Sequence, residues 1–541
     1  MIFGRSRRRA FRPQLPVDMK QAIEAMTAEE LRSFVLDVLE RLDEEQRGAI
    51  IDALIARAAS SGWKPASPSP RVLEEVREFA RAARRTGSAD PEDVDGYLRQ
   101  GSRAFLAGDY AIARQVFETL LVPLAEAEID LGQHETVDEV LTVDLHECAA
   151  RHVASVYTTT PIDDRVEAVW RAIHAVHGVA SFWEPLAEME RVAAGSLPDM
   201  DAFLPRWLRH IERQPQPEGD WEQDRDRWLR EAVSRLEGVG GLERIARRTK
   251  RPEALLAWCE ALAEKGDWAG ALRACEEAAG LTANPHWRGD FLDGAALAAQ
   301  QLGQGDVVDR LEAAWVGSPS LMRLARWLGA GAPTVESMVE RARSAIARCP
   351  AKARCQRGLL HLLAGDIYDA AKLLAKAPGL GWSDDDHPGH LLFAAFAGLL
   401  ARGTKAGLCA ELFAELNVML QDPADMWSGE EAEGRPSLAT TSVADLIRSC
   451  RPEVRIDSRE RAIVLEAMQS AAEKRVEGIL ANKRRRHYGH AAALVACCLE
   501  VSPTAGKQQE VKDWIDELRK KYSRFPAFRE ELRNALAAIQ R

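Results

Sequence analysis

The sequence predicts an all-α protein built from irregular α-α hairpin repeats, with a small helical unit at each end. Three observations predict this class. Leu, Ala, Glu and Arg dominate the composition, and runs of β-branched or aromatic residues are scarce. This balance favours helices because Ala and straight-chain residues lose little conformational freedom in them. Helix-capping patterns precede several amphipathic stretches, and a Gly-Asp turn between two helix-like stretches occurs three times.

The bulk properties limit the possible classes of protein. The chain has 541 residues, of which 46% are hydrophobic, and a formal net charge of -11. This length suggests about three or four domains or one long repeat array. The acidic balance argues against a chain-wide nucleic-acid surface, although local basic patches remain possible. No apolar run approaches the ~18 residues of a transmembrane helix. Nine cysteines without a CxxC pair indicate reduced thiols, and we expect a cytoplasmic protein.

The first part of the chain is expected to be a basic tail followed by a helical unit. Residues 1–16 include Arg5–Arg12, which we interpret as solvated; a contact with nucleic acid, an acidic partner or a membrane surface is the alternative. Within residues 17–63, Thr27-Ala-Glu-Glu30 forms a capping box. Six apolar residues then recur at helical spacing and predict one buried face: Leu31, Phe34, Val35, Val38, Leu39 and Leu42.

Proline, glycine and charge divide the rest of the chain. Asp90-Pro91 is a typical helix start, a helix is expected from Val137, and Asp457 is expected to cap a long helix. Met426 lies in an acidic stretch that we expect to be a flexible, protease-sensitive loop, and whether it is a processing site stays open. The predicted segments are a linker at 64–70, a helical-repeat region at 71–213, a linker at 214–220, a second helical-repeat region at 221–421, the acidic loop at 422–438 and a helical region at 439–541.

The three Gly-Asp turns align as copies of one helix-turn-helix unit. Small residues precede and follow the turn at fixed spacing, and such residues let two helix backbones approach. Proline is expected to end the second helix at Pro123 and Pro378. The packing positions are Gly101, Gly108, Ala113 and Phe117 in the first copy, Gly266 and Ala271 in the second with Cys259 and Cys275, and Gly358, Gly365 and Ala370 in the third.

This spacing resembles the tetratricopeptide repeat, a helix pair of about 34 residues with small residues at fixed positions and a terminal proline. The resemblance implies a superhelical solenoid whose concave face binds peptides or protein surfaces. The full signature's early Trp and central Tyr are missing. The turn glycines are not separated by multiples of about 34 residues, so irregular hairpins are expected between the copies.

A second resemblance lies near the C-terminus. The stretches Asn482-Lys-Arg-Arg-Arg-His-Tyr488 and Trp514-Ile-Asp-Glu-Leu-Arg519 resemble the helical regions attached to bacterial SWIM zinc-finger proteins. The zinc finger itself, a CxC followed by CxH, is absent. The resemblance therefore implies a bacterial helical scaffold and carries no zinc-binding or DNA-binding residue to this chain.

Several histidine, aspartate and cysteine residues could be metal ligands, but each also has an ordinary structural interpretation. His146 and His152 are six residues apart and would not share a helix face, so packing is expected there. Asp384-Asp-Asp-His-Pro-Gly-His390 gathers carboxylates and imidazoles in one loop. It would be a divalent-metal site or an acidic contact patch, or simply the start of a helix with His387 in the loop, which we favour. The adjacent pair Cys497-Cys498 is expected in the core.

Two further patterns have both a structural and a binding interpretation. Trp207, Trp228 and Trp327 each stand in Arg-Trp-Leu, which we assign to helix packing rather than to a peptide-binding groove. A basic run near the C-terminus is expected to be a solvated turn between helices, with a contact to phosphates or an acidic segment as the alternative. Its residues are Lys483, Arg484, Arg485, Arg486 and His487.

These patterns indicate a binding protein. No P-loop and no Gly-x-Ser-x-Gly elbow is present, and no catalytic, cofactor-binding or metal-binding residue is assigned. The leading hypothesis is a non-catalytic, cytoplasmic scaffold or adaptor that binds a protein partner. The alternative is an accessory protein associated with nucleic acid, of a bacterial defence system for example, that uses the basic residues 5–12 and 483–487. An enzyme with a cryptic metal site is the third and least favoured hypothesis.

Overall fold

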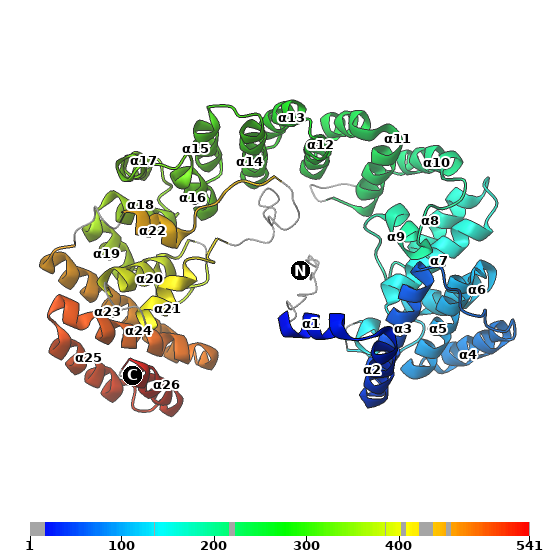
Figure 1. The fold of residues 1–541 in the computed structure, drawn as a ribbon, viewed down its shortest axis with the longest axis horizontal. Helices are drawn as coiled ribbons and strands as arrows, with labels where there is room; N and C mark the ends of the chain where they lie inside the picture. The colour runs from blue at the N-terminus through cyan, green and yellow to red at the C-terminus, as the bar shows by residue number, and fades with distance from the viewer. Residues whose placement is uncertain are drawn as a thin grey trace. The chain divides into compact units, whose positions relative to one another are not determined.

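The computed structural model describes residues 17–134, 136–215, 222–384, 386–401, 407–420, 436–450 and 456–539. Helices dominate these residues (Figure 1), which contain no strand and only an isolated β-bridge between Ser88 and Asp130. The prediction of an all-α fold is therefore confirmed. The chain divides into two compact units, Met1–Gly241 and Leu242–Arg541.

The first unit is a series of helices in which chain neighbours pack together. Helix α5 packs on α6, α6 on α7, and α7 on both α8 and α9. The helices are α1 (Val17–Ala25), α2 (Ala28–Arg41), α3 (Glu44–Ser60), α4 (Val72–Thr86), α5 (Pro91–Ala107), α6 (Tyr110–Ala125), the 3-10 turn η1 (Val137–Glu139), α7 (Leu145–Thr159), α8 (Arg165–Ala175), α9 (Pro185–Ala193), α10 (Met200–Arg213) and α11 (Asp224–Thr249). Helix α11 is kinked at Gly238, whose backbone is not helical (φ 63°, ψ -147°).

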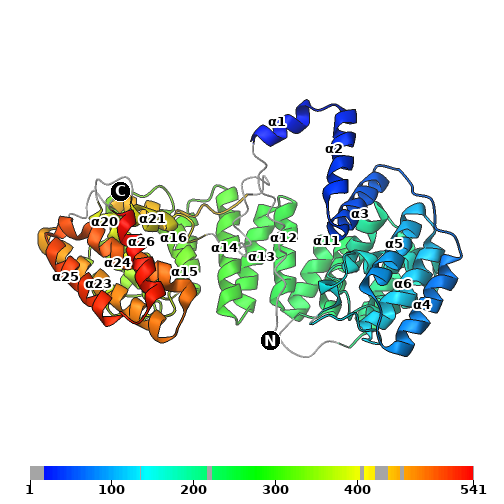
Figure 2. The same cartoon turned by 90° about the horizontal axis from the view of Figure 1, so that it is seen from below.

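The second unit starts in the same way. Helices α12, α13 and α14 lie side by side with their axes roughly aligned (Figure 2), and α13 and α14 are in extensive contact. Farther along the chain, α23 packs on α19 and on α24. The helices of the first half are α12 (Pro252–Glu264), α13 (Trp268–Leu281), α14 (Pro285–Gln301), α15 (Val307–Gly317), α16 (Leu321–Gly329), α17 (Val335–Ile346), α18 (Arg354–Ala364) and α19 (Ile367–Ala375). Those of the second half are α20 (Pro388–Leu400), α21 (Leu408–Glu415), α22 (Val443–Cys450), α23 (Ser458–Ala481), η3 (Arg485–His487), α24 (Tyr488–Val501), η4 (Ser502–Ala505), α25 (Gln508–Lys521) and α26 (Pro526–Ala538).

The Gly-Asp turn has the same backbone structure in all three copies. Gly108, Gly266 and Gly365 have φ values of 87°, 74° and 85°, in the left-handed region that glycine adopts without strain. The amide of the following aspartate donates a hydrogen bond to the carbonyl five residues before it, at 2.9, 3.0 and 2.8 Å. This bond is typical of a Schellman ending. The aspartate also caps the next helix in the first two copies, whereas Asp366 makes no side-chain cap bond.

The small residues around the turns lie where helices meet. A Cβ atom added at Gly101 would lie 2.9 Å from the Phe117 ring, so these two positions touch in the first copy. In the third copy, Gly358 faces Leu392 of α20 instead, with a Cβ at 2.8 Å from the leucine side chain. All three alanines that follow the turns are buried: Ala113, Ala271 and Ala370.

Local capping predictions are confirmed, and two boundary predictions are wrong. The capping boxes at Thr27 and Asp457 are present, and Asp90 caps α5 with a proline at its first position. Helix α6, however, continues through Pro123 to Ala125, since a proline in the last turn removes only one backbone bond.

The helix expected from Val137 begins only at Leu145. The chain before it is bound outside the helix by the buried carboxylate of Asp95 in α5. That carboxylate accepts hydrogen bonds from the backbone amides of Thr142 and Val143, at 2.9 and 3.1 Å. A contact with a distant residue therefore overrides the local helical preference.

A buried ionic cluster fixes the stretch before α22 to the second unit. Arg323 and Arg326 of α16 are 3% and 1% exposed, and both face Asp293 of α14, at 2.7 and 3.4 Å. Arg326 Nε also donates to Thr440 Oγ1 at 2.9 Å. Charges so far from water are tolerated only when they are paired. The cluster therefore links α14, α16 and the chain around Thr440.

Candidate functional site

The N-terminal helices expose apolar side chains that the sequence predicted to be buried. No side chain of α2 is buried, and Phe34 from the expected buried face is 55% exposed. The prediction of a buried face is therefore wrong, because α2 makes only a small contact with α3 and no other described helix packs closely on it. Seven of the thirteen large hydrophobic side chains that are exposed in the described residues lie in this part of the chain: Ile23, Phe34, Leu36, Ile50, Ile51, Leu54 and Trp63. We call these seven residues the N-terminal apolar surface.

Helix α3 is attached to the rest of the unit by polar contacts on one face. Arg99 of α5 donates from Nε to Asp52 Oδ2 at 3.0 Å, and its guanidinium lies against Gly48. Residues 48 and 52 are one helical turn apart and share a face. Ile50 and Leu54 each follow one of them by two positions, which places them about 200° around the helix on the opposite face. The attachment therefore leaves them uncovered.

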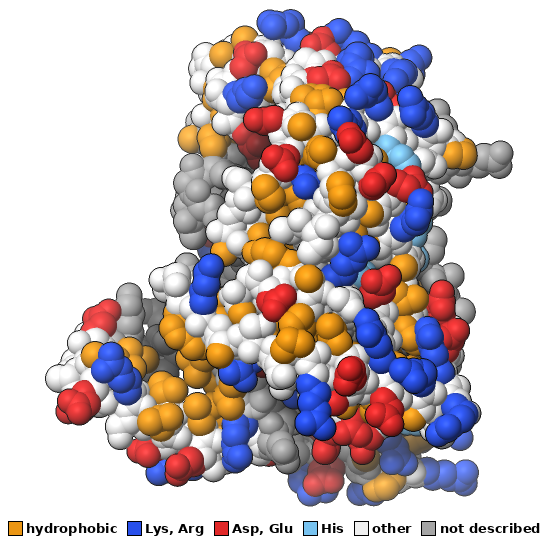
Figure 3. All heavy atoms as spheres, turned by 90° about the vertical axis from the view of Figure 1, so that its right-hand side faces the viewer, with side chains coloured by type: hydrophobic (Ala, Val, Ile, Leu, Met, Phe, Trp, Pro, Cys, Tyr) orange, Lys and Arg blue, Asp and Glu red, His pale blue; other side chains and the backbone are white. Residues whose placement is uncertain are grey.

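The surroundings of the N-terminal apolar surface are acidic. Residues 17–63 contain ten acidic and five basic side chains, which gives a net charge of -5. The side view of the first unit shows hydrophobic side chains at the surface among charged ones (Figure 3). An apolar surface with a charged border is typical of an interaction site.

The predicted basic patch is exposed. All four residues from Lys483 to Arg486 are exposed, in the turn between α23 and α24. None of the four forms an ion pair within the part of the chain that the structure describes. The patch is therefore available for an anionic partner, and its geometry fits a solvated turn equally well.

The loop that precedes α20 is built around a histidine cap. His387 is buried; its Nδ1 accepts from the amide of Gly389 at 3.0 Å, and its Nε2 lies 3.0 Å from the carbonyl oxygen of Pro378. Both ring nitrogens are thus engaged by the backbone. His390 points elsewhere and pairs with Glu415 at 2.8 Å. This arrangement fits the interpretation as a helix start, and Asp385 lies outside the described residues.

The three Arg-Trp-Leu tryptophans are buried. Trp207, Trp228 and Trp327 are at most 2% exposed. The first two lie in a cluster with Trp170, whose ring centroid is 5.8 Å from that of Trp207 and 5.4 Å from that of Trp228. Trp327 stacks on Trp315 at 5.3 Å. These rings are part of the helix packing and offer no groove.

All nine cysteines are free and buried. They include two thiol pairs that come together across helix contacts. Cys259 and Cys275 face each other between α12 and α13, and a hydrogen bond between them is the main cause that raises the pKa of Cys259. Cys409 and Cys497 form the second pair, between α21 and α24.

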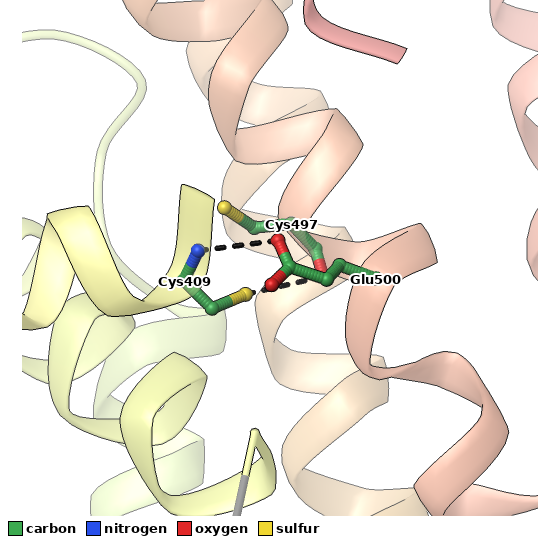
Figure 4. Close-up of side chains that lie close together, drawn as sticks. All are labelled: Cys409, Cys497 and Glu500. Atoms are coloured by element: carbon green, nitrogen blue, oxygen red, sulfur yellow. Dashed lines mark hydrogen bonds between the residues drawn. The ribbon is translucent and has the colours of Figure 1, made fainter. Parts of the chain in front are cut away.

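The second cysteine pair is joined by a carboxylate. The Sγ atoms of Cys409 and Cys497 and a carboxylate oxygen of Glu500 all lie within 4.8 Å of one another (Figure 4). Among the described residues this is the one group of three His, Cys, Asp or Glu side chains with such a spacing. The group could not be found from sequence patterns because Cys409 is far from Cys497 in the chain. The spacing Cys497-x-x-Glu500, which places both on one helix face, was the available signal.

Several predicted features lie outside the described residues. They are the basic residues 5–12, most of the linker at 214–220 and most of the acidic loop, including Met426. No helix among the described residues is long and apolar enough to cross a membrane. Comparisons of this chain with protein-family models, with curated proteins and with solved structures gave no match.

Proposed function

We propose that this protein is a non-catalytic, tetratricopeptide-like helical scaffold that binds a protein partner through the N-terminal apolar surface. The observation that carries the proposal is the concentration of exposed apolar side chains in residues 17–63. Large apolar side chains gain roughly 1.5–3 kcal/mol each when a contact removes them fully from water. A helical unit that leaves several of them exposed within a short stretch of chain is suited to docking.

The chemistry of the surface defines the partner. Phe34 and Leu54 are exposed apolar side chains of the kind that an amphipathic helix of a partner would cover. The net charge of -5 around them favours a partner with basic residues beside its apolar stripe. Nine free cysteines support a reducing compartment such as the bacterial cytoplasm.

The experiment is a quantitative pull-down from the native host with tagged full-length protein. The test variant is Phe34→Ser/Leu54→Ser, and the matched control is Tyr368→Ser, which changes an exposed aromatic residue of the second unit. The proposal predicts a partner that binds the wild type and the control and is lost with the double variant. A partner that all three proteins retain would contradict the assignment of this surface.

Self-association is the competing outcome for the same surface. Sedimentation of the purified wild type and the double variant tests it directly. A wild-type dimer that the double variant turns into a monomer would show that a second copy covers the surface, and would contradict a role in binding another protein there.

The exposed basic patch supports a second candidate function, a contact with nucleic acid. Binding to DNA or RNA through Lys483–Arg486 would weaken steeply with salt, because counterions are released from the phosphates. Replacing Arg484, Arg485 and Arg486 with Gln would reduce both the affinity and its dependence on salt. Binding that is absent, or unchanged in this variant, would exclude the candidate.

A further inference from the structure

The cluster of Cys409, Cys497 and Glu500 has the composition of a metal site. Cys409 is the second residue of α21, and Cys497 and Glu500 lie on one face of α24. Both thiols are fully buried, and the carboxylate reaches them from the edge of the helix contact (Figure 4). Two sulfur donors and one oxygen donor therefore converge from two different helices.

The Glu500 carboxylate accepts a hydrogen bond from the start of α21 and lies close to Gly407. Glu500 Oε2 accepts a hydrogen bond from the backbone amide of Cys409 at 3.2 Å. Gly407, just before α21, has a φ of 133°, and a Cβ atom added there would lie 2.2 Å from Glu500 Oε1. A side chain at position 407 would meet this carboxylate and would also be strained by the positive φ. The Gly407 backbone thus lies directly against the Glu500 carboxylate.

Ordinary packing does not require this arrangement. Cys259 and Cys275 form the other buried thiol pair, and no carboxylate joins them into a group of three among the residues that the structure describes. The two pairs therefore differ in the one feature that a metal site needs, a third donor at coordinating distance. The contact with Cys497 and burial both raise the pKa of Cys409.

The distances between the donor atoms and the types of donor favour zinc over other metal ions. Zn–S bonds of about 2.3 Å in tetrahedral geometry place two sulfur atoms about 3.8 Å apart. The three donor atoms lie within 4.8 Å of one another, so closing around an ion requires movements of about 1 Å or less. Thiolates favour zinc over magnesium or calcium, which take oxygen ligands.

We propose that Cys409, Cys497 and Glu500 bind one zinc ion that links α21 to α24. Two S–H bonds break and two Zn–S bonds form; the two protons leave to solvent, and the carboxylate supplies the third bond without a change in oxidation state. Cys498 is the next residue after Cys497 on α24 and points about 100° away around the helix, so the fourth position is left to water. The site goes beyond the proposed scaffold function and does not depend on it.

The test is metal binding by the full chain. Protein purified under reducing conditions is freed of metal with a chelator, dialysed, and titrated with zinc and with cobalt. We expect one equivalent of zinc by elemental analysis, and for cobalt the absorption bands of tetrahedral coordination with a thiolate charge-transfer band. The absence of both signals in the wild type would overturn the proposal.

Two variants test the proposed ligands, and a third variant is the control. Cys409→Ser removes one sulfur donor, and Glu500→Gln removes the charged oxygen while its amide oxygen can still accept from the amide of Cys409. Each should lower the affinity by at least the roughly 10- to 100-fold that indirect changes already produce at metal sites. Cys275→Ser, in the pair without a carboxylate, should bind like the wild type.

Two control measurements distinguish the loss of a metal ligand from misfolding and from oxidation of the cysteines. Circular dichroism of Glu500→Gln should match the wild type, which ensures that lost binding reflects the ligand and not the fold. Wild-type affinity in both Cys409→Ser and Glu500→Gln would overturn the assignment. So would a peptide map that shows Cys409 and Cys497 joined by a disulfide after reducing purification, because a disulfide leaves no thiolate for the metal.

Discussion

The contact between Gly101 and Phe117 gives a direct test of the helix pair around the first Gly-Asp turn. Gly101→Ala adds one methyl group at 2.9 Å from the ring of Phe117 and 3.1 Å from Val116. Both neighbours are fully buried, so the side chains around them limit how far they can shift. Overpacking of this kind costs about 1–3 kcal/mol, whereas alanine gains about 0.5–1 kcal/mol over glycine through its helix preference. Gly101→Ala is therefore expected to lower the free energy of unfolding by between about 0 and 2.5 kcal/mol.

The same helix provides the matched control. Gly96 is also in α5, but nothing lies within 4 Å of a Cβ atom added there. Gly96→Ala should therefore show only the gain of about 0.5–1 kcal/mol. Thermal unfolding followed by circular dichroism measures the difference, at about 2–4 °C per kcal/mol for a unit of this size. Equal melting temperatures for Gly96→Ala and Gly101→Ala would refute the close contact.

Two further predictions concern buried ionisable groups. Asp293→Ala removes the buried carboxylate that Arg323 and Arg326 share, while Arg323 keeps its contact with Asp290 at 2.6 Å, and should destabilise the second unit by about 1–3 kcal/mol. Asp309→Ala on an exposed position of α15 should change stability by less than about 0.5 kcal/mol, and denaturant unfolding of both variants checks this difference. Burial lowers the pKa of His152 from 6.5 to about 4, so the unfolded chain binds the proton more readily and stability falls as the pH drops from about 6.5 to about 4. The loss of stability over this pH range is on the order of 3 kcal/mol. His152→Gln should make the free energy of unfolding depend less on pH, whereas the control His286→Gln, at an exposed position, should not. An equal dependence on pH in the two variants would contradict the assignment.

Local chemistry explains what the sequence could predict. The Gly-Asp turns follow from residues within a few positions: a glycine that tolerates positive φ and an aspartate that accepts backbone hydrogen bonds. The capping box at Thr27 is local in the same sense. The all-α class follows from composition, which sums many such local preferences.

Contacts between distant residues explain what the sequence could not predict. Asp95 binds the backbone at Thr142 outside any helix, so the helix expected from Val137 starts later. Cys409 meets Cys497 only because α21 packs on α24. No residue near either cysteine in the chain encodes that contact.

The N-terminal apolar surface shows a different limit of sequence reasoning. The helical pattern around Phe34 correctly indicates an apolar face. A pattern of this kind records that a face is apolar and does not record what covers it. In this chain the face stays exposed, and that exposure became the basis of the proposed function.

The most direct test of the central claim is the pull-down with Phe34→Ser/Leu54→Ser beside Tyr368→Ser. The scaffold account predicts one host protein, carrying an amphipathic helix with a basic border, that the wild type and Tyr368→Ser bind and the double variant loses. Equal recovery of that protein by all three forms, with all three folded by circular dichroism, would contradict the claim.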